Sequence, residues 1–308
     1  GSSFYRVTLN KKYFLNPYFL LILVSLIWGF NFSIVKIGIL AVGPLAFSFL
    51  RFIFSALLMF LVLCLTEKNP WVEVKDLPYF LFLGFLGFGI YQPLWSYGLN
   101  LSLASHSALI LSLSPIVVSL VALVQKEELV GGINLLGVII GFGGVAFLVS
   151  QGGNGGYSPQ SVLYGDLLTL GAAICWGLYS YFGKNMVKKY SPLKTSTWSI
   201  LWGLVFMFPV CIGETLQVKG EDFNFPLLLS LSYAVVLSSL VAYIIWMQCV
   251  KELGAARTIS SQYITQVVGV IAAWMIFGEP LGWRVFLGMA FISLGLWLIH
   301  KKPSGGEL

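Results

Sequence analysis

The sequence predicts an all-α polytopic membrane protein: ten transmembrane helices arranged in two inverted-topology five-helix repeats. The chain of 308 residues is 58% hydrophobic and only 10% charged, with a mean hydropathy of +0.88, so it has too few charged residues for a soluble surface. Its apolar runs are continuous and about 20 residues long, the length that crosses a bilayer core as a helix. The two halves of the chain also resemble each other.

The internal repeat appears when the sequence is shifted by 148 positions, which places Trp28 on Trp176 and Lys36 on Lys184. Further along, a shift of 151 aligns the pairs Trp95 and Trp246, Ala104 and Ala255, Glu128 and Glu279, and Gly137 and Gly288. A period this long indicates that a half-protein was duplicated. The difference between the two shifts requires only a change in loop length.

Each predicted span follows from an apolar run of bilayer-crossing length. The ten spans are 17–38, 44–65, 77–98, 104–124, 132–150, 163–186, 194–213, 226–250, 257–277 and 281–300.

Positive charges predict the orientation of these spans. Of the eighteen Lys and Arg residues, fourteen fall on the side of the two chain ends, three fall on the opposite side, and Arg51 lies within a span. By the positive-inside rule, both termini are expected in the cytoplasm. Five spans per half mean that residues 17–150 and 163–300 form two repeats of opposite orientation, an arrangement typical of secondary transporters with a midplane binding site.

Several short motifs support a resemblance to a known family. They are the Trp-Gly pairs of the first and sixth spans, the Ala-Ser-His-Ser-Ala-Leu…Ser-Pro stretch of residues 104–115, and the acidic turns at residues 126–129 and 277–281. In their order, spacing and duplication they resemble the EamA type of the drug/metabolite transporter superfamily. The resemblance implies two inverted five-helix repeats, a central cavity, and alternating access for a small organic solute, often in the export direction.

The composition provides no catalytic or metal-binding cluster. His106 and His300 are the only histidines, and the acidic residues lie in loops or near span ends. The four cysteines lie singly in apolar runs and are interpreted as small buried hydrophobes. We therefore expect no enzyme activity, no cofactor, no metal and no disulfide framework. The net charge of +6 lies in loops and reports topology, so a nucleic-acid partner is not expected.

Charged residues inside or beside the spans are candidates for gating. Arg51 lies within the second span, and intramembrane charges usually face a transport path; the alternative is that it snorkels to the nearby interface. Lys36 and Lys184 occupy equivalent repeat positions and are interpreted either as matched gate residues or as snorkelling helix-end residues. Asp166 is interpreted as a charge near a helix start, favoured by the helix dipole, rather than as a proton carrier.

Helical spacing groups the candidate substrate-binding residues. Aromatic, amide and imidazole side chains recur near the middle or outer ends of six spans, at positions that share a helix face, and an amide facing lipid would be left without a partner. The alternatives are aromatic packing and interhelical hydrogen bonds. The candidates are Trp28, Asn31, Tyr91, Gln92, Trp95, His106, Trp176, Tyr179, Tyr243, Gln262, Tyr263 and Gln266.

Rings and neutral amides of this kind suit an amphipathic or zwitterionic solute. We expect a secondary transporter, an exporter or facilitator, of small organic metabolites and in particular amino acids; the alternative is a multidrug or quaternary-amine efflux protein. A membrane enzyme would need a polar catalytic cluster, and a sensor would need a soluble output domain.

The expected location is the bacterial inner or plasma membrane, with the lipid bilayer and the small-molecule solute as partners. Small-residue faces in residues 132–150 and 281–300 predict either a scaffold or a homodimer surface.

Overall fold

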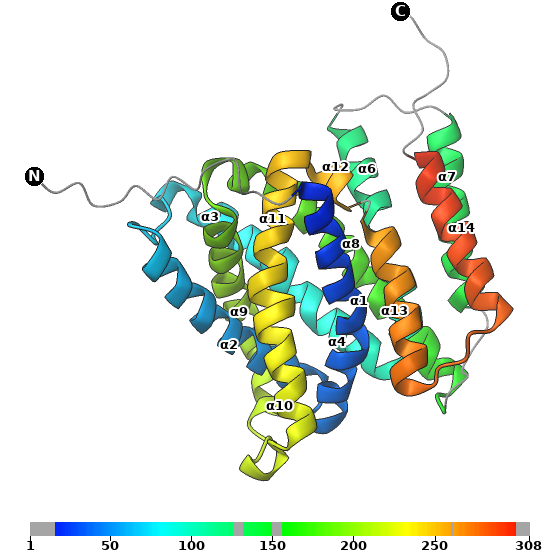
Figure 1. The fold of residues 1–308 in the computed structure, drawn as a ribbon, viewed down its shortest axis with the longest axis horizontal. Coiled ribbons are helices and arrows are strands. Elements are labelled where there is room, and N and C mark those ends of the chain that lie inside the picture. The colour runs from blue at the N-terminus through cyan, green and yellow to red at the C-terminus, as the bar shows by residue number, and fades with distance from the viewer. Residues whose placement is uncertain (1–15, 126–131, 150–155, 260, 300–308) are drawn as a thin grey trace, which may run out of the picture.

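The structure, a computed structural model, describes residues 16–125, 132–149, 156–259 and 261–299, and all regular elements in these ranges are helical (Figure 1). The first half contains α1 (Pro17–Val42), α2 (Pro44–Thr66), η2 (Val74–Asp76), α3 (Leu77–Gly84), η3 (Phe85–Ile90), α4 (Tyr91–Leu101), α5 (Ala104–Leu111), α6 (Ser114–Val124) and α7 (Gly132–Val149). The second half contains α8 (Pro159–Lys189), α9 (Pro192–Thr215), η4 (Gly220–Asp222), α10 (Phe225–Ser232), η5 (Tyr233–Val241), α11 (Ala242–Leu253), α12 (Ala255–Ile259), α13 (Gln262–Phe277) and α14 (Trp283–Ile299).

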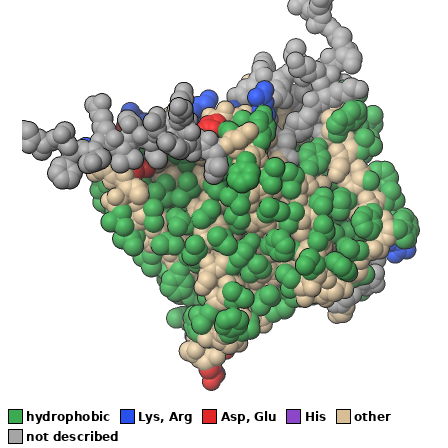
Figure 2. All heavy atoms as spheres, in the orientation of Figure 1, with side chains coloured by type: hydrophobic (Ala, Val, Ile, Leu, Met, Phe, Trp, Pro, Cys, Tyr) green, Lys and Arg blue, Asp and Glu red, His purple; other side chains and the backbone are tan. Residues whose placement is uncertain are grey.

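Eight helical segments of the described chain are long and apolar enough to cross a membrane. They are Pro17–Val42, Pro44–Thr66, Val74–Leu101, Ala104–Ala122, Pro159–Lys189, Pro192–Thr215, Phe225–Leu253 and Arg257–Phe277, with a shorter apolar stretch at Trp283–Gly295. Hydrophobic side chains cover a broad band of the surface, and the charged side chains in view gather toward its two ends (Figure 2). The prediction of a helical chain with many spans is confirmed.

The beginning of α1 and the end of α14 lie at the same end of the bundle, at the top of Figure 1. We call this end the termini side and the other end the opposite side. Two connections are very short: Gly43 alone joins α1 to α2, and residues 190–191 join α8 to α9. In both cases a proline at the first helical position begins the next helix. Proline suits that position, where its missing N–H has no partner to lose.

The third span is interrupted by η3, a widened π-helical turn that ends three residues before Pro93. Pro93 has no N–H to donate to the carbonyl four residues earlier, so the helical hydrogen-bond ladder is disturbed there. A shift of 151 carries residues 85–90 onto 236–241, which lie inside the second π-helical segment, η5. The two halves therefore share this irregularity, although η5 has no proline after it.

The fourth and ninth spans are also interrupted. The fourth breaks at Ser112 and Leu113, between α5 and α6, and the ninth breaks between α12 and α13. Pro115 follows the first break, but Gln266 stands at the equivalent position of the second half. Both spans are broken within about one turn of the same repeat position, so proline is not the common cause.

The most extensive helix contacts join the two halves: α1 packs on α13, α2 on α9, α4 on α8, and α7 on α14. The backbones of α1 and α13 approach closely, since a Cβ on Gly29 would lie 2.4 Å from a methyl carbon of Val268. A Cβ on Gly295 of α14 would lie 2.6 Å from the Gly137 carbonyl oxygen of α7. Small residues permit these contacts, and the pair α7–α14 forms one edge of the bundle (Figure 1).

Candidate functional site

A buried cavity lies where helices of both halves meet. In this conformation its volume is about 30 Å³, room for one or two water molecules. A metabolite can bind only after the surrounding side chains move. The lining residues are Trp28, Asn31, Phe32, Arg51, Tyr91, Gln92, Trp95, Leu111, Trp176, Ser238, Tyr243, Gln262 and Thr265.

Aromatic rings from four helices form most of the wall. Trp28 of α1 meets Trp176 of α8 edge to face, with ring centroids 5.3 Å apart, and meets Tyr243 of α11 at 5.6 Å. Tyr91 and Trp95 of α4 are nearly parallel, and the Tyr91 ring lies 5.5 Å from the Trp176 ring. Such clusters present ring faces that attract cations and ring edges that pack with apolar groups.

Arg51 is the charged residue of this cavity. Only 2% of its surface is exposed, so it does not snorkel. Its guanidinium donates to the hydroxyls of Ser238 (2.9 Å) and Ser239 (3.3 Å), and it lies 4.8 Å from the centre of the Phe52 ring. Among the described residues no carboxylate lies within ion-pair distance of it. Two serine hydroxyls leave most of its five donors free to bind an anion.

Several polar atoms of the lining residues also lack a partner within the described protein. The side-chain oxygens of Asn31 and Gln92 accept no hydrogen bond, and the indole N–H groups of Trp95 and Trp176 donate none. Buried polar groups are normally satisfied, so each such group requires an explanation. The lining residues thus carry two acceptors and two donors without a partner in the described protein, beside one guanidinium.

Eight of the twelve candidate substrate-binding residues line the cavity: Trp28, Asn31, Tyr91, Gln92, Trp95, Trp176, Tyr243 and Gln262. Arg51, expected as a gate or charge residue, lines it as well. Phe32, Leu111, Ser238 and Thr265 were not among the candidates. Phe32 shares the helix face of Trp28 and Asn31, a signal that the sequence contains. Ser238 lies in the π-helical segment η5, where the changed turn geometry makes a helical face hard to predict.

Four candidates lie outside the cavity lining. The Tyr179 ring packs behind it, 5.4 Å from Trp176 and 5.5 Å from Phe88. Tyr263 packs against a separate apolar cluster that contains Leu109 and Ile110.

The other two candidates outside the lining form hydrogen bonds between helices. Gln266 accepts from Ser112 at 2.9 Å and donates to Ser293 at 3.1 Å. His106 contacts Asp166 at 2.9 Å. For Gln266 the alternative interpretation, interhelical hydrogen bonding, describes the contacts.

Asp166 is not a charge at a helix start. It lies seven residues into α8, about 10 Å along the axis, and is 1% exposed. Its carboxylate accepts from the Ser102 hydroxyl at 2.5 Å and contacts His106.

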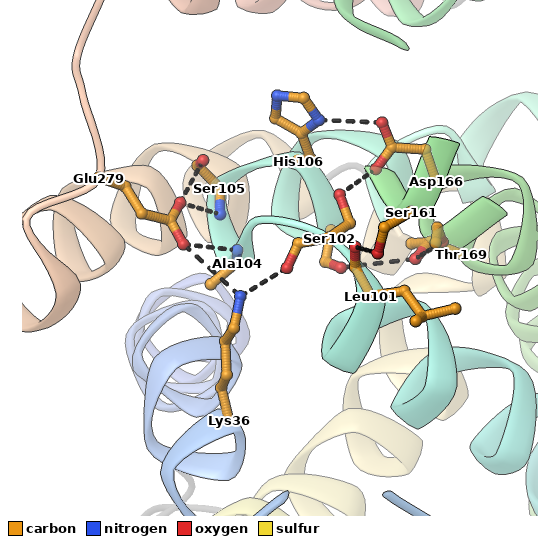
Figure 3. Close-up of polar contacts among 12 residues, drawn as sticks. Lys36, Leu101, Ser102, Ala104, Ser105, His106, Ser161, Asp166, Thr169 and Glu279 are labelled. Atoms are coloured by element: carbon orange, nitrogen blue, oxygen red, sulfur yellow. Dashed lines mark hydrogen bonds and ion pairs between the residues drawn. The ribbon is translucent and has the colours of Figure 1, made fainter. Parts of the chain in front are cut away.

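Lys36 belongs to the same network (Figure 3), because its ammonium donates to the Ser102 carbonyl and lies 3.9 Å from Glu279. Lys36 is only 2% exposed, so it does not snorkel. These contacts close the opposite side of the bundle.

Charged residues also link the two halves on the termini side. Lys194 lies 3.0 Å from Glu67, and Lys189 lies 2.5 Å from Asp76 and 2.8 Å from Glu73. Hydrogen bonds from Lys189 and Lys75 hold the pKa of the Glu73 carboxyl below its usual value. The ammonium of Lys184, the gating candidate on this side, lies 3.8 Å from the centre of the Tyr181 ring. Contacts between the two halves are therefore present on both sides of the bundle: ion pairs on the termini side, and an ion pair with hydrogen bonds to backbone groups on the opposite side.

No group of three or more His, Cys, Asp or Glu side chains in the described ranges is arranged to hold a metal ion. His300 and the acidic turn at residues 127–128 lie outside those ranges. Apolar spans around a cavity lined by aromatic and polar side chains, with interrupted helices beside it, define the class of this protein: a polytopic helical membrane protein built like a solute transporter.

The chain belongs to the EamA-like transporter family, whose sequence model matches residues 15–150 and again residues 163–300. Its relatives have related names. The uncharacterized transporter YyaM of Bacillus subtilis (strain 168) is 25% identical over 92% of both chains. An uncharacterized transporter of Archaeoglobus fulgidus is 24% identical, covering 94% of this chain and 100% of the relative.

A third relative has a more specific name. The probable terminal-alkyne amino-acid exporter of Streptantibioticus cattleyicolor is 24% identical, covering 92% of this chain and 93% of the relative. One crystal structure has the same fold, with a TM-score of 0.64 and 16% identity over 92% of this chain and 95% of that chain. The protein is therefore a multi-pass membrane transporter, and the expected fold class and family are confirmed.

Proposed function

We propose that this transporter exports, or facilitates the passage of, small amino acids or closely similar zwitterionic metabolites by alternating access around the central cavity. Its location would be a bacterial inner membrane with both termini in the cytoplasm, as the positive charges predict. The name of the Streptantibioticus cattleyicolor relative agrees with this substrate class.

The observation that carries the proposal is Arg51. A buried guanidinium without a carboxylate partner in the described protein is costly unless a bound group compensates its charge. The group that matches its planar fork is a carboxylate, held by two parallel hydrogen bonds. A phosphate ester would call for several cations, and Arg51 is the one cationic side chain among the lining residues.

The remaining lining groups suit the other half of an amino acid. The free side-chain oxygens of Asn31 and Gln92 can accept hydrogen bonds from an ammonium group. The faces of Trp28 and Trp176 can attract the same cation or pack on an apolar side chain. Carboxylate, ammonium and side chain of one solute each have a complementary group in the wall.

Efflux of quaternary amines, the alternative, has less support. A permanently cationic solute in this cavity would lie beside the Arg51 guanidinium in a medium of low dielectric constant, where like charges repel strongly. The aromatic wall alone favours such a solute, but no carboxylate among the lining residues balances it.

The test is counterflow in proteoliposomes with labelled amino acids, comparing the unaltered protein with Arg51→Gln. We expect Arg51→Gln to weaken binding at least about tenfold, equivalent to about 1.4 kcal/mol, because the amide cannot balance a carboxylate. Amino alcohols, which lack the carboxylate, should be poor substrates of the unaltered protein. A matched control is Arg284→Gln, which removes an exposed arginine of α14.

If Arg51→Gln and Arg284→Gln transport amino acids equally well, Arg51 is not part of the binding site. Accumulation of quaternary amines, with no amino acid exchanged, would favour the alternative function. Running the assay with and without a pH gradient separates a facilitator from a proton-coupled carrier.

A further inference from the structure

A second cavity lies on the opposite side of the bundle, beside the end of α1. Its volume is about 130 Å³, several times the space in the central cavity. The lining residues are Lys36, Leu40, Leu103, Tyr157, Phe277, Gly278 and Glu279. They come from α1, from the connection between α4 and α5, from the segment before α8, and from the end of α13.

Lys36 has unused hydrogen-bonding capacity in this cavity. Its ammonium carries three donors, and one of them is given to the Ser102 carbonyl. The nearest Glu279 oxygen is 3.9 Å away, close enough for charge attraction but too far for a hydrogen bond. The Tyr157 ring centre lies 4.8 Å from the ammonium and the Phe277 ring centre 5.7 Å. Within the part of the chain that the structure describes, two donors therefore remain for a ligand.

Glu279 has matching capacity of the opposite kind. Its Oε2 accepts from the backbone N–H of Ser105 (3.0 Å) and from the Ser105 hydroxyl, while among the described residues its Oε1 accepts only from the backbone N–H of Ala104 (2.8 Å). A carboxylate oxygen offers about two acceptor positions. One position on Oε1, the oxygen nearer to Lys36, is therefore left for an additional donor.

We propose that this cavity is a second binding site for the zwitterionic head of the transported solute, with its carboxylate on Lys36 and its ammonium on Glu279. This inference rests on the proposed function for the identity of the solute, but not for the existence of the site. The site places a buried cation and a buried anion, 3.9 Å apart and both with free capacity, in the wall of a cavity of about 130 Å³.

The position of the site fits a two-stage path. Lys36 follows Trp28 by eight residues on α1, so the two cavities lie about 12 Å apart along that helix. A solute that leaves Arg51 toward the opposite side meets Lys36 next, and the same carboxylate can pass from one cation to the other. At both stages the charged head is held by protein groups, which compensates for the water it has lost.

The site also acts on the network that closes this side. Lys36 and Glu279 each bind a residue at the junction of α4 and α5, and they attract each other. A zwitterion can contact both residues at once, its carboxylate on Lys36 and its ammonium on Glu279. The ion pair can then separate without leaving either buried charge unpaired. A solute with only one of the two charges would leave either Lys36 or Glu279 without a partner of opposite charge.

The test is equilibrium binding of radiolabelled glycine to the purified full-length protein, in a two-by-two set of variants. The set is the unaltered protein, Arg51→Gln, Lys36→Gln, and Arg51→Gln combined with Lys36→Gln. We expect Arg51→Gln to retain one bound glycine per chain and the double variant to retain none. Lys219→Gln is the control, because Lys219 is an exposed lysine of the same side.

The conservative variant Lys36→Arg should keep the binding, which separates loss of the cation from loss of the fold. In the unaltered protein, acetate and ethylamine should each displace glycine at least about tenfold less well than alanine does, since each carries one of the two charges.

Binding in Arg51→Gln that is unchanged by Lys36→Gln would overturn the second site and leave the proposed function intact. Binding that is lost with Lys36→Gln but unaffected by Arg51→Gln would support the second site and count against the central one.

Discussion

Buried charges in this transporter are of two kinds, and the difference separates structure from function. Asp166 contacts His106 and accepts from the Ser102 hydroxyl near the opposite side. Arg51 is held by two serine hydroxyls and has no acidic partner among the described residues. A paired charge stabilises an arrangement of helices, while an unpaired one in a cavity is suited to a ligand.

Replacing Asp166 by alanine should strongly destabilise the protein. The change leaves His106 and the Ser102 hydroxyl without their acceptor inside the bundle, and breaking a buried pair on one side costs about 3–5 kcal/mol. The measurement is unfolding in a mild detergent, followed by the signal of the aromatic side chains. A double-mutant cycle with His106→Ala is the control: the double variant should lose less than the sum of the two single variants, and simple additivity would contradict the pairing.

At the scale of the helix, two carboxylates of the second half cap helices of the first. The residues before α2 and α5 are Gly43 and Leu103, and neither has a side chain that can accept a hydrogen bond. Glu214 accepts the first N–H groups of α2, at 2.7 and 3.2 Å, and Glu279 does the same for α5. A carboxylate at a helix N-terminus also interacts favourably with the helix dipole.

Gly43 fits this arrangement in two ways. Its φ of 91° is a conformation that glycine adopts at no steric cost, and a Cβ there would lie 1.7 Å from the Glu214 carboxylate. The cap and the turn that receives it thus depend on each other, although 169 and 168 positions separate Glu214 from the two residues it binds.

Glu214→Gln should lower the free energy of unfolding by about 1 kcal/mol, the usual contribution of a helix cap, because the amide keeps an acceptor oxygen but loses the charge. The measurement is the shift of the unfolding midpoint in detergent. Glu221→Gln serves as the control, since Glu221 is exposed on a nearby loop with 75% of its side chain accessible. Equal midpoints for the two variants would contradict the capping role.

At the scale of the whole molecule, the two halves are packed into each other rather than side by side. The principal partner of α1, α2, α4 and α7 is in each case a helix of the other half. Both ends of the central cavity are closed by contacts between the halves. Opening one end would require the halves to separate there, which is the motion that the proposed alternating access needs.

The predicted orientation can be tested with two matched lysines. Lys75 and Lys219 both have side chains that are 73% exposed, but they lie in connections on different sides of the bundle. If both termini are cytoplasmic, a membrane-impermeant amine reagent added to intact cells should modify Lys219 and spare Lys75, and both should react after lysis. Modification of Lys75 with protection of Lys219 would mean the reverse orientation.

Much of this architecture was predictable from local and periodic features. Run length and hydropathy predict the spans, and the aligned Trp28 and Trp176 predict the repeat. Helical spacing brought together most of the cavity wall, because residues three and four positions apart share a face. The same rule grouped Gln266 and Tyr263 with these residues, but neither lines the cavity. Spacing predicts which residues share a helix face, whereas packing decides what that face contacts.

The contacts that decide the site arise from tertiary structure. Whether Arg51 snorkels or points inward depends on Ser238 and Ser239, 187 and 188 positions away and on an irregular helical turn. His106 meets Asp166, and Glu279 meets Ala104, only because the halves interlock. Span length, hydropathy and repeat period are properties of continuous segments and can be recognised in the chain alone, whereas a buried charge finds its partner through the packing of helices from both halves.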